Sequence, residues 1–170
     1  MNGKDKIADA YKNLVIENKK MDITVSEICR RADVSRSLFY KYYMDVYDVV
    51  EYIFTEDVFK DLVIFLNENM RKKDIVYQWY MSFYKKKDFY TVAFKICDEH
   101  SLFEIVLKKL YLLNKTLLKN SHLIEEDLDY YSYREAALQV MLLKKWMSDD
   151  MTVHPKKMAS YFMKSMPGDI

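Results

Sequence analysis

The sequence predicts an all-α protein, and three observations support this prediction. Only two Gly and two Pro occur in 170 residues, whereas the many turns of a β protein depend on such residues. Apolar residues recur at helical spacing along most of the chain. Hydrophobic residues make up 51% of the chain, which supplies a core and excludes a disordered protein. We expect about nine helices, with one domain over residues 1–50 and a second over residues 51–170.

The first helix is expected from about Lys4 to Lys19. Its apolar residues occupy positions i, i+3, i+4, i+7 and i+8, which places them on one face of a helix. That face would complete a three-helix core with the next two helices. The residues are Ile7, Ala10, Tyr11, Leu14 and Val15.

The second helix is expected to begin after Thr24, because Thr24 and Glu27 have the spacing of a capping box. The sequence Asp33-Val34-Ser35 ends this helix, and Ser35 can cap the next one. The second helix would bury a stripe formed by Val25, Ile28, Cys29 and Ala32.

The third helix would direct Leu38 and Phe39 inward and leave polar residues near its start free to contact a partner. Two short helices joined by a tight turn, with basic and polar residues at the start of the second, are typical of a helix-turn-helix DNA reader. The outward residues are Arg36, Ser37, Tyr40 and Lys41.

This region resembles the DNA-binding signature of TetR/AcrR-type regulators over roughly the first 50 residues. The sequence departs from that signature at three places: Asp33 replaces the usual Gly, Ser37-Leu38 replaces Gly-Thr, and Val46 replaces a frequent Lys. Asp is compatible with the left-handed backbone that Gly adopts there. The resemblance is carried by Thr24-Val25, Ile28, Ala32, Val34-Ser35-Arg36, Phe39-Tyr40, Tyr42-Tyr43, Asp45 and Asp48-Val49.

The resemblance and the position of these residues predict a DNA-binding surface. Hydroxyl and backbone N–H groups at helix N-termini suit phosphates, and side chains at the start of the recognition helix reach base edges in the major groove. The net charge of the chain is only +1, so we expect DNA affinity to depend on a few local charges and on two copies of the reader. The predicted DNA-binding residues are Thr24, Ser35, Arg36, Ser37, Tyr40, Lys41 and Tyr42.

A long helix is expected to begin at Asp45 and to continue to about residue 69, so that the domain boundary falls inside a helix. Further helices are expected over residues 75–85, 89–97, 102–118, 126–147 and 155–166. The last two, with Trp146 and Pro155, resemble the final helix pair of the family. The short C-terminal domain is also similar to that of the dihydroxyacetone-kinase operon regulators.

The resemblance implies a ligand cavity and a dimer surface in the C-terminal domain. The aromatic density of residues 75–94 predicts the cavity, although the same rings could simply fill a core. The last helix pair has apolar faces that could form a four-helix bundle with a second copy, or an ordinary core pair. The predicted ligand residues are Trp79, Tyr80, Phe83, Tyr84, Tyr90 and Phe94, and the predicted dimer residues are Val140, Leu143, Trp146, Met158 and Phe162.

The sequence argues against enzymatic chemistry, so we expect no cofactor and no metal. His100, His122 and His154 are isolated, and two Gly cannot form a phosphate-binding loop. The charged N-terminus is not a signal peptide, and no apolar run is long enough to cross a membrane. With the single, distant Cys29 and Cys97 expected to be reduced thiols, a cytoplasmic protein is predicted.

The favoured interpretation is a homodimeric regulator that binds a palindromic operator and is released by an unknown small-molecule effector, as a repressor would be. The alternative is a TetR-like co-regulator that acts through protein contacts without reading DNA. Asp33, Val46 and the small excess of positive charge motivate the alternative.

Overall fold

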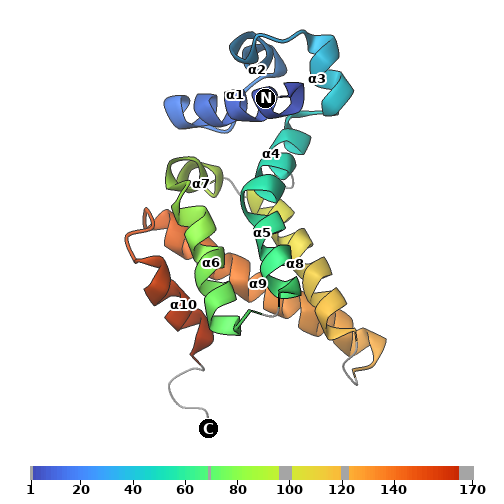
Figure 1. Cartoon of the computed structure of the whole chain (residues 1–170), viewed down its shortest axis with the longest axis vertical. Coiled ribbons are helices and arrows are strands. Elements are labelled where there is room, and N and C mark those ends of the chain that lie inside the picture. Colours follow the sequence, from blue (N-terminus) through green and yellow to red (C-terminus); the bar gives the residue numbers. More distant parts are fainter. Residues whose placement is uncertain (1, 69, 96–100, 120–122, 165–170) are drawn as a thin grey trace.

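The computed structural model describes residues 2–68, 70–95, 101–119 and 123–164, and within those ranges it contains helices and no strand. The prediction of an all-α protein is therefore confirmed. Three consecutive segments form one continuous rod, so the described part of the chain has nine helical rods, as expected. Figure 1 shows the first three helices at one end of an elongated molecule and the later helices packed together toward the other.

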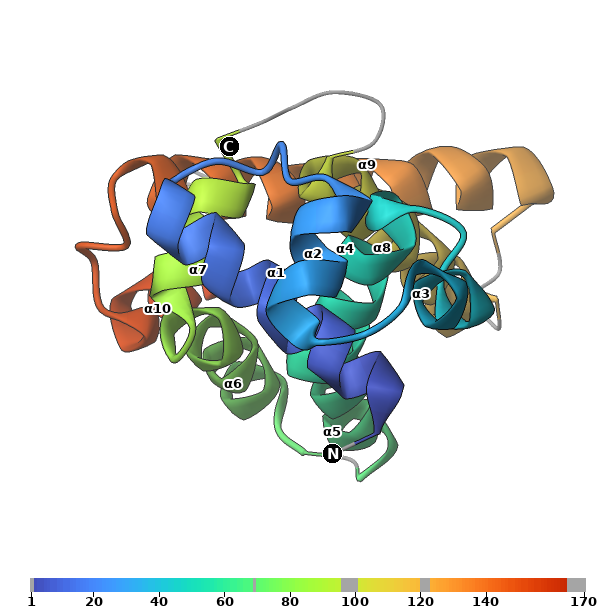
Figure 2. The same cartoon turned by 90° about the horizontal axis from the view of Figure 1, so that it is seen from above.

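The first three helices form what we call the reader unit: α1 (Gly3–Asn18), α2 (Val25–Ala32) and α3 (Arg36–Tyr42). Its core is made by the predicted apolar stripes and Phe39 of α3, all of which are buried except Val25 and Ala32, which are partly buried against that core. The Tyr11 hydroxyl donates a hydrogen bond to the Met21 carbonyl at 3.1 Å, which fixes the segment between α1 and α2. Seen from above, the reader unit lies over the C-terminal helices (Figure 2).

The connecting helix consists of α4 (Val46–Phe54), the π-helical turn η1 (Thr55–Phe59) and α5 (Lys60–Asn67). Asp45 begins it as predicted, because its carboxylate accepts a hydrogen bond from the Asp48 backbone N–H at 3.0 Å. The sequence did not predict the π-helical turn. A π turn holds one more residue than an α turn. Helix α5, which follows it, is therefore rotated about the helix axis relative to its position in an uninterrupted α-helix of the same residues.

The spacing of the buried residues explains that turn. Apolar residues repeat at every fourth position, and in an uninterrupted α-helix such a row drifts by roughly 40° at each step. The π-helical turn takes up the drift, so a row that would have wound around the helix stays on its inner side. The row consists of Val50, Phe54, Val58 and Leu62, which are buried, and the partly buried Leu66.

The C-terminal body contains α6 (Lys72–Tyr84), α7 (Lys87–Ala93), α8 (Leu102–Leu118), α9 (Glu125–Ser148) and α10 (Pro155–Met163). The predicted helices 102–118 and 126–147 agree with α8 and α9 to within a residue. Helix α6 begins three residues before the predicted position, and α7 ends at Ala93 rather than 97; residues 97 and 166, where two predicted helices end, lie outside the described residues. Helix α9 runs across the whole body (Figure 2).

The turn between α9 and α10 is held by Trp146, whose indole N–H donates to the Val153 carbonyl at 2.7 Å. Asp150 and Met151 adopt positive φ angles of 52° and 51° there, which reverses the chain direction. Pro155 occupies the first turn of α10, as predicted. Of the helices in the described part of the chain, none is both long and apolar enough to cross a membrane.

Candidate nucleic-acid interface and effector cavity

The start of α2 has the complete capping box that the sequence predicts. The Thr24 hydroxyl oxygen accepts from the Glu27 backbone N–H at 3.3 Å, and the Glu27 carboxylate accepts from the Thr24 backbone N–H at 2.7 Å. The Thr24 hydroxyl also donates to that carboxylate at 2.6 Å. These hydrogen bonds from Thr24, first from its hydroxyl and then from its backbone, lower the pKa of Glu27. Residues at the start of α2 are therefore fixed before any partner binds.

The turn between α2 and α3 depends on Asp33, which stands where related signatures have Gly. Asp33 has φ 52° and ψ 54°, the left-handed conformation that terminates α2. The Cys29 carbonyl accepts from the Val34 backbone N–H at 3.0 Å, which closes the turn. Asp33 therefore takes the backbone conformation expected of the Gly that it replaces.

Helix α3 presents the predicted recognition residues to solvent. Ser35 caps it by accepting from the Leu38 backbone N–H at 3.1 Å, and Phe39 is buried beneath it. Tyr42 is only half-exposed because it packs against α1, where a Cβ on Gly3 would come within 3.0 Å of its ring. The structure thus brings five of the seven predicted residues to an open surface of α3 and its start: Ser35, Arg36, Ser37, Tyr40 and Lys41.

Arg36 is oriented by Ser26, a residue that was not among the predicted DNA-binding residues. Its guanidinium donates to the hydroxyl of Ser26 on α2, so the side chain extends along the surface that joins the two helices. Ser26 is exposed, and its place just after the Thr24 cap is the signal that could have identified it. The pair sets the position of the first basic side chain of α3.

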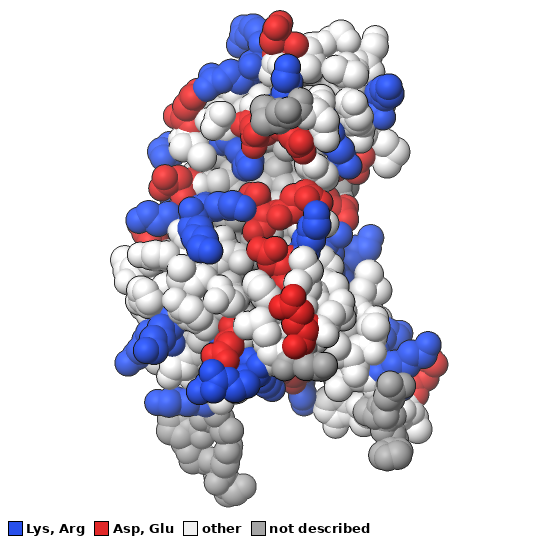
Figure 3. Space-filling model, in the orientation of Figure 1, with Lys and Arg blue, Asp and Glu red and all other residues white. Residues whose placement is uncertain are grey.

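The positive charge of this surface is modest. Arg31 is held by Glu17 of α1 in an ion pair, so Arg30, Arg36 and Lys41 are the cations of α2 and α3 for which the structure shows no carboxylate partner. Val46, which replaces a frequent Lys, packs against the core. Figure 3 shows acidic side chains gathered along the middle of one face of the molecule, with basic ones on both sides of them and toward its two ends.

Two tyrosines fasten α1, one to the end of α3 and the other to α4. The Tyr43 hydroxyl donates to the Lys4 carbonyl at 3.0 Å, and the Tyr52 hydroxyl donates to the Asp5 carboxylate at 2.7 Å. That hydrogen bond to Asp5, reinforced by burial, raises the pKa of Tyr52 to about 12. Because Tyr52 belongs to the connecting helix, a rotation of that helix would be transmitted directly to α1.

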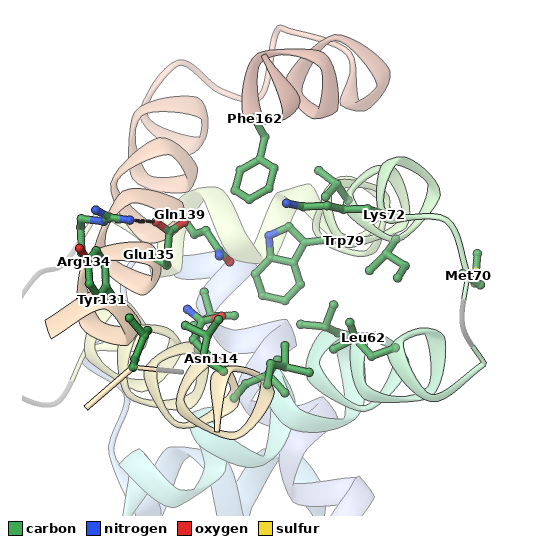
Figure 4. A pocket seen from close by; sticks show the side chains of 18 residues that line it. Leu62, Met70, Lys72, Trp79, Asn114, Tyr131, Arg134, Glu135, Gln139 and Phe162 are labelled. Atoms are coloured by element: carbon green, nitrogen blue, oxygen red, sulfur yellow. Dashed lines mark hydrogen bonds and ion pairs between the residues drawn. The ribbon is translucent and has the colours of Figure 1, made fainter. Parts of the chain in front are cut away.

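A cavity of about 580 Å³ lies between α5, α6, α8, α9 and α10. This volume is in the range of small-molecule sites. Most of its wall is aliphatic, and Figure 4 shows the polar side chains that interrupt it. It is lined by Leu62, Leu66, Met70, Lys72, Ile75, Val76, Trp79, Leu110, Leu113, Asn114, Leu117, Leu118, Leu123, Tyr131, Arg134, Glu135, Gln139 and Phe162.

Of the six predicted ligand residues, only Trp79 lines this cavity. Tyr80, Phe83, Tyr90 and Phe94 are buried, and Tyr84 is half-buried. Their rings interlock edge to face, which fills space without leaving a hole; the Phe83 and Tyr90 centroids, for example, are 4.8 Å apart. The aromatic segment therefore forms a packed core beside the cavity, which was the other interpretation of its composition.

The predicted dimer residues lie inside the protomer. Val140, Leu143, Trp146 and Met158 are buried, and Phe162 lines the cavity. Helix α9 has a second apolar face, which the sequence reasoning did not separate from the first. The outer face of α9, as we call it, has the exposed residues Tyr130, Tyr133, Leu138 and Met141 and the half-buried Ala137.

The isolated histidines do not suggest a metal centre. His154 caps α10 by accepting at Nδ1 from the Lys156 backbone N–H at 3.2 Å. His100 and His122, together with Cys97 and Gly168, lie outside the described residues. In the described ranges no group of His, Cys, Asp and Glu could hold a metal ion, and Cys29 is a buried free thiol.

No family model matches the chain, and no curated protein matches it. Among solved structures, the protein described as "Dihydroxyacetone kinase operon activator DhaS" is similar, with a TM-score of 0.61 and 18% sequence identity. The match covers 94% of this chain and 90% of that chain. At this identity the likeness concerns the fold. The chain therefore shares its all-helical fold, over nearly its whole length, with a protein described as an operon activator.

Proposed function

We propose that this protein is a ligand-responsive DNA-binding regulator of transcription, of the TetR type. The observation that carries the proposal is the α2–turn–α3 unit, which is capped at both helix starts and exposes polar and basic side chains along α3. A recognition helix presented in this way fits the major groove. The fold shared with a protein described as an operon activator supports the same assignment.

We further propose that residues 1–50 and 51–170 act as separate domains and that the protein works as a homodimer. A palindromic operator requires two readers about one helical turn apart. The outer face of α9 suits a second copy, because Tyr130, Leu138 and Met141 are 72%, 61% and 55% exposed on one helix. Apolar side chains clustered in this way are typical of protein contact surfaces.

The connecting helix is the element that would join the effector to the reader. Leu62 and Leu66 of α5 line the cavity, while Tyr52 of α4 holds α1. An effector that binds one orientation of α5 more tightly would shift the equilibrium between two reader spacings in the dimer. The size of that shift is set by the difference in effector affinity for the two orientations. Release of the operator on effector binding, as in a repressor, is the expected result.

The test is DNA binding by the purified protein, with the DNA upstream of its gene and with duplexes selected from a random library. A complex that survives nonspecific competitor and weakens as salt rises would support the reader. The variant Arg36→Ala with Lys41→Ala should weaken that complex at least tenfold, because a charged contact to DNA typically contributes about 1–3 kcal/mol. Lys85→Ala, an exposed change far from α3, serves as the control.

One observation favours a second candidate function, a co-regulator that acts by protein contacts. Only a few cations are unpaired on the reader surface, and α4 begins with Val46 instead of a basic residue. If no selected duplex survives competitor at low salt, the DNA-binding proposal fails and the co-regulator is favoured. If a specific complex forms but the Arg36 and Lys41 variant binds equally well, α3 is not the recognition helix.

A further inference from the structure

The polar groups of the cavity limit the chemistry of its ligand. We propose that the cavity binds a neutral, mainly aliphatic carbonyl compound, such as a ketone or an ester, whose oxygen accepts a hydrogen bond from the indole N–H of Trp79. This inference rests on the proposed function, since it names the class of effector for the same protein.

The wall is aliphatic on most sides. Helices α5 and α8 contribute leucines only, apart from Asn114, and α6 adds Ile75 and Val76. Flat aromatic ligands gain from ring partners, but the aromatic side chains of the body are mostly used in the adjacent core. A flexible aliphatic ligand fits a leucine wall better, because it gains from buried area without needing a ring to stack on.

Trp79 supplies a donor to the cavity. Its side chain is only 7% exposed, and its rings pack on Phe54 and Phe83. No described residue accepts a hydrogen bond from its indole N–H, which faces the interior of the cavity in Figure 4. An indole nitrogen can only donate, so the complementary ligand atom must be an acceptor. The N–H is open to the cavity rather than fully buried, so a ligand oxygen would take the place of water there.

Gln139 lies across the cavity from Trp79, and it also has no partner among the described residues (Figure 4). Its side-chain amide can donate a second hydrogen bond to the same oxygen. The Asn114 amide already donates to the Ser132 carbonyl at 3.3 Å. A carbonyl oxygen can accept from both donors, whereas a hydroxyl group would bring an O–H donor of its own that also needs a partner.

The charges of the lining argue against an ionised ligand. Arg134 is paired with Glu135 at 2.7 Å, and its guanidinium also lies over the Tyr131 ring. Lys72 also lines the cavity, where Figure 4 shows its amine directed inward, but the residue is exposed to solvent. Arg134 is thus already paired and Lys72 is exposed, so a carboxylate buried at the Trp79 donor would lose its hydration without an ion pair that the structure provides.

Nitrogen-15 NMR of the full chain tests this directly, because the sequence has only two Trp residues and hence two indole N–H signals. The Trp79→Phe variant assigns them. Addition of 2-decanone should move the Trp79 signal downfield, as expected when the N–H gains an acceptor. The Trp146 signal should stay in place, because that N–H is already bonded to the Val153 carbonyl.

Affinity measurements test the same proposal independently of NMR. By calorimetry, 2-decanone should bind at least tenfold more tightly than decanoate, and Lys72→Met should change the 2-decanone affinity less than twofold. Gln139→Leu should weaken it by roughly 2- to 10-fold, the range for one hydrogen bond.

Three results would overturn the inference: no binding of 2-decanone, binding without movement of the Trp79 signal, or tighter binding of decanoate that Lys72→Met abolishes. The last would mean that Lys72 holds an acid. None of these measurements uses DNA, so ligand binding can be scored even if the proposed reader fails, and a specific DNA complex can be found even if no ketone binds.

Discussion

Lys12 of the reader unit and Asp57 of the π-helical turn approach to 3.7 Å, and Lys86 beside α7 lies 2.8 Å from the same carboxylate oxygen. One carboxylate therefore joins the reader unit, the connecting helix and the C-terminal body. The Asp57 side chain is only 11% exposed, so its two ion pairs are less screened by solvent than surface pairs are.

Replacing this carboxylate tests how the reader unit is held. Asp57→Asn keeps the shape of the side chain and removes its charge, so we expect the free energy of unfolding to fall by about 1–2 kcal/mol. Amide hydrogens of α1 should also exchange faster. The measurements are urea denaturation and hydrogen exchange, with Asp61→Asn, an exposed change on α5, as the control. Equal stability of the two variants would show that Asp57 does not fasten α1.

The buried tyrosines offer a matched pair of substitutions. The Tyr90 hydroxyl is buried with no hydrogen-bond partner in the described part of the chain, whereas the Tyr43 hydroxyl donates to the Lys4 carbonyl. Removing an unpaired polar atom should leave stability unchanged or raise it by up to about 1 kcal/mol, and removing a bonded one should lower it by about 1 kcal/mol. We therefore expect Tyr90→Phe to denature at an equal or higher urea concentration, and Tyr43→Phe at a lower one. The opposite order would contradict the assignment of the two hydroxyls.

The capping box predicts a pH dependence of stability. Hydrogen bonds from Thr24 lower the pKa of Glu27 in the folded protein below its ordinary value. A group with a lowered folded pKa stabilises the protein above its unfolded pKa, and this contribution disappears as pH falls through the folded value. Between neutral pH and the acid side of the ordinary Glu pKa, wild type should therefore lose more stability than Glu27→Gln does. Parallel curves of urea midpoint against pH would rule out the contribution.

The outer face of α9 predicts the dimer. A charge placed on an exposed apolar contact surface should prevent association, so Leu138→Glu with Met141→Glu should give a monomer in sedimentation equilibrium. Ile64→Glu, which changes an exposed apolar residue on α5, should leave the dimer intact. If both variants and the wild type are monomers, the palindromic operator proposal loses its second reader. If all remain dimers, another surface forms the contact.

The sequence was most informative where a local rule determines the structure. The caps at Thr24, Ser35 and Asp45 depend on residues three positions apart, so they could be predicted without the fold. Asp33 was predicted to tolerate a left-handed conformation, and the structure has it there. The order and approximate bounds of the helices follow from apolar periodicity in the same way.

The residues that line the cavity and those that form the exposed apolar face could not be predicted, because they depend on which helices pack together. Trp79 and Tyr80 are neighbours in sequence, yet one lines the cavity and the other packs on Trp146 with ring centroids 5.3 Å apart. Helix α9 carries apolar residues on two sides, and periodicity alone does not say which side faces the protomer core. The buried side has Val140 and Leu143, and the exposed side has Leu138 and Met141.

The π-helical turn links the number of residues in the connecting helix to the orientation of α5. A π turn holds one residue more than an α turn, so deleting one residue from Thr55–Phe59 would restore α-helical winding and leave α5 nearly in place. Rewinding the same five residues as a plain α-helix would instead rotate α5 by about 100° about its axis. Leu62 and Leu66 would then turn away from the cavity while Tyr52 kept its hold on α1. The winding of the connecting helix thus fixes the angle between the reader unit and the cavity about the helix axis. Among related chains, a one-residue deletion that removes the π turn would keep the two ends of the molecule in the same relative orientation, whereas a one-residue deletion elsewhere in the connecting helix would rotate one end relative to the other.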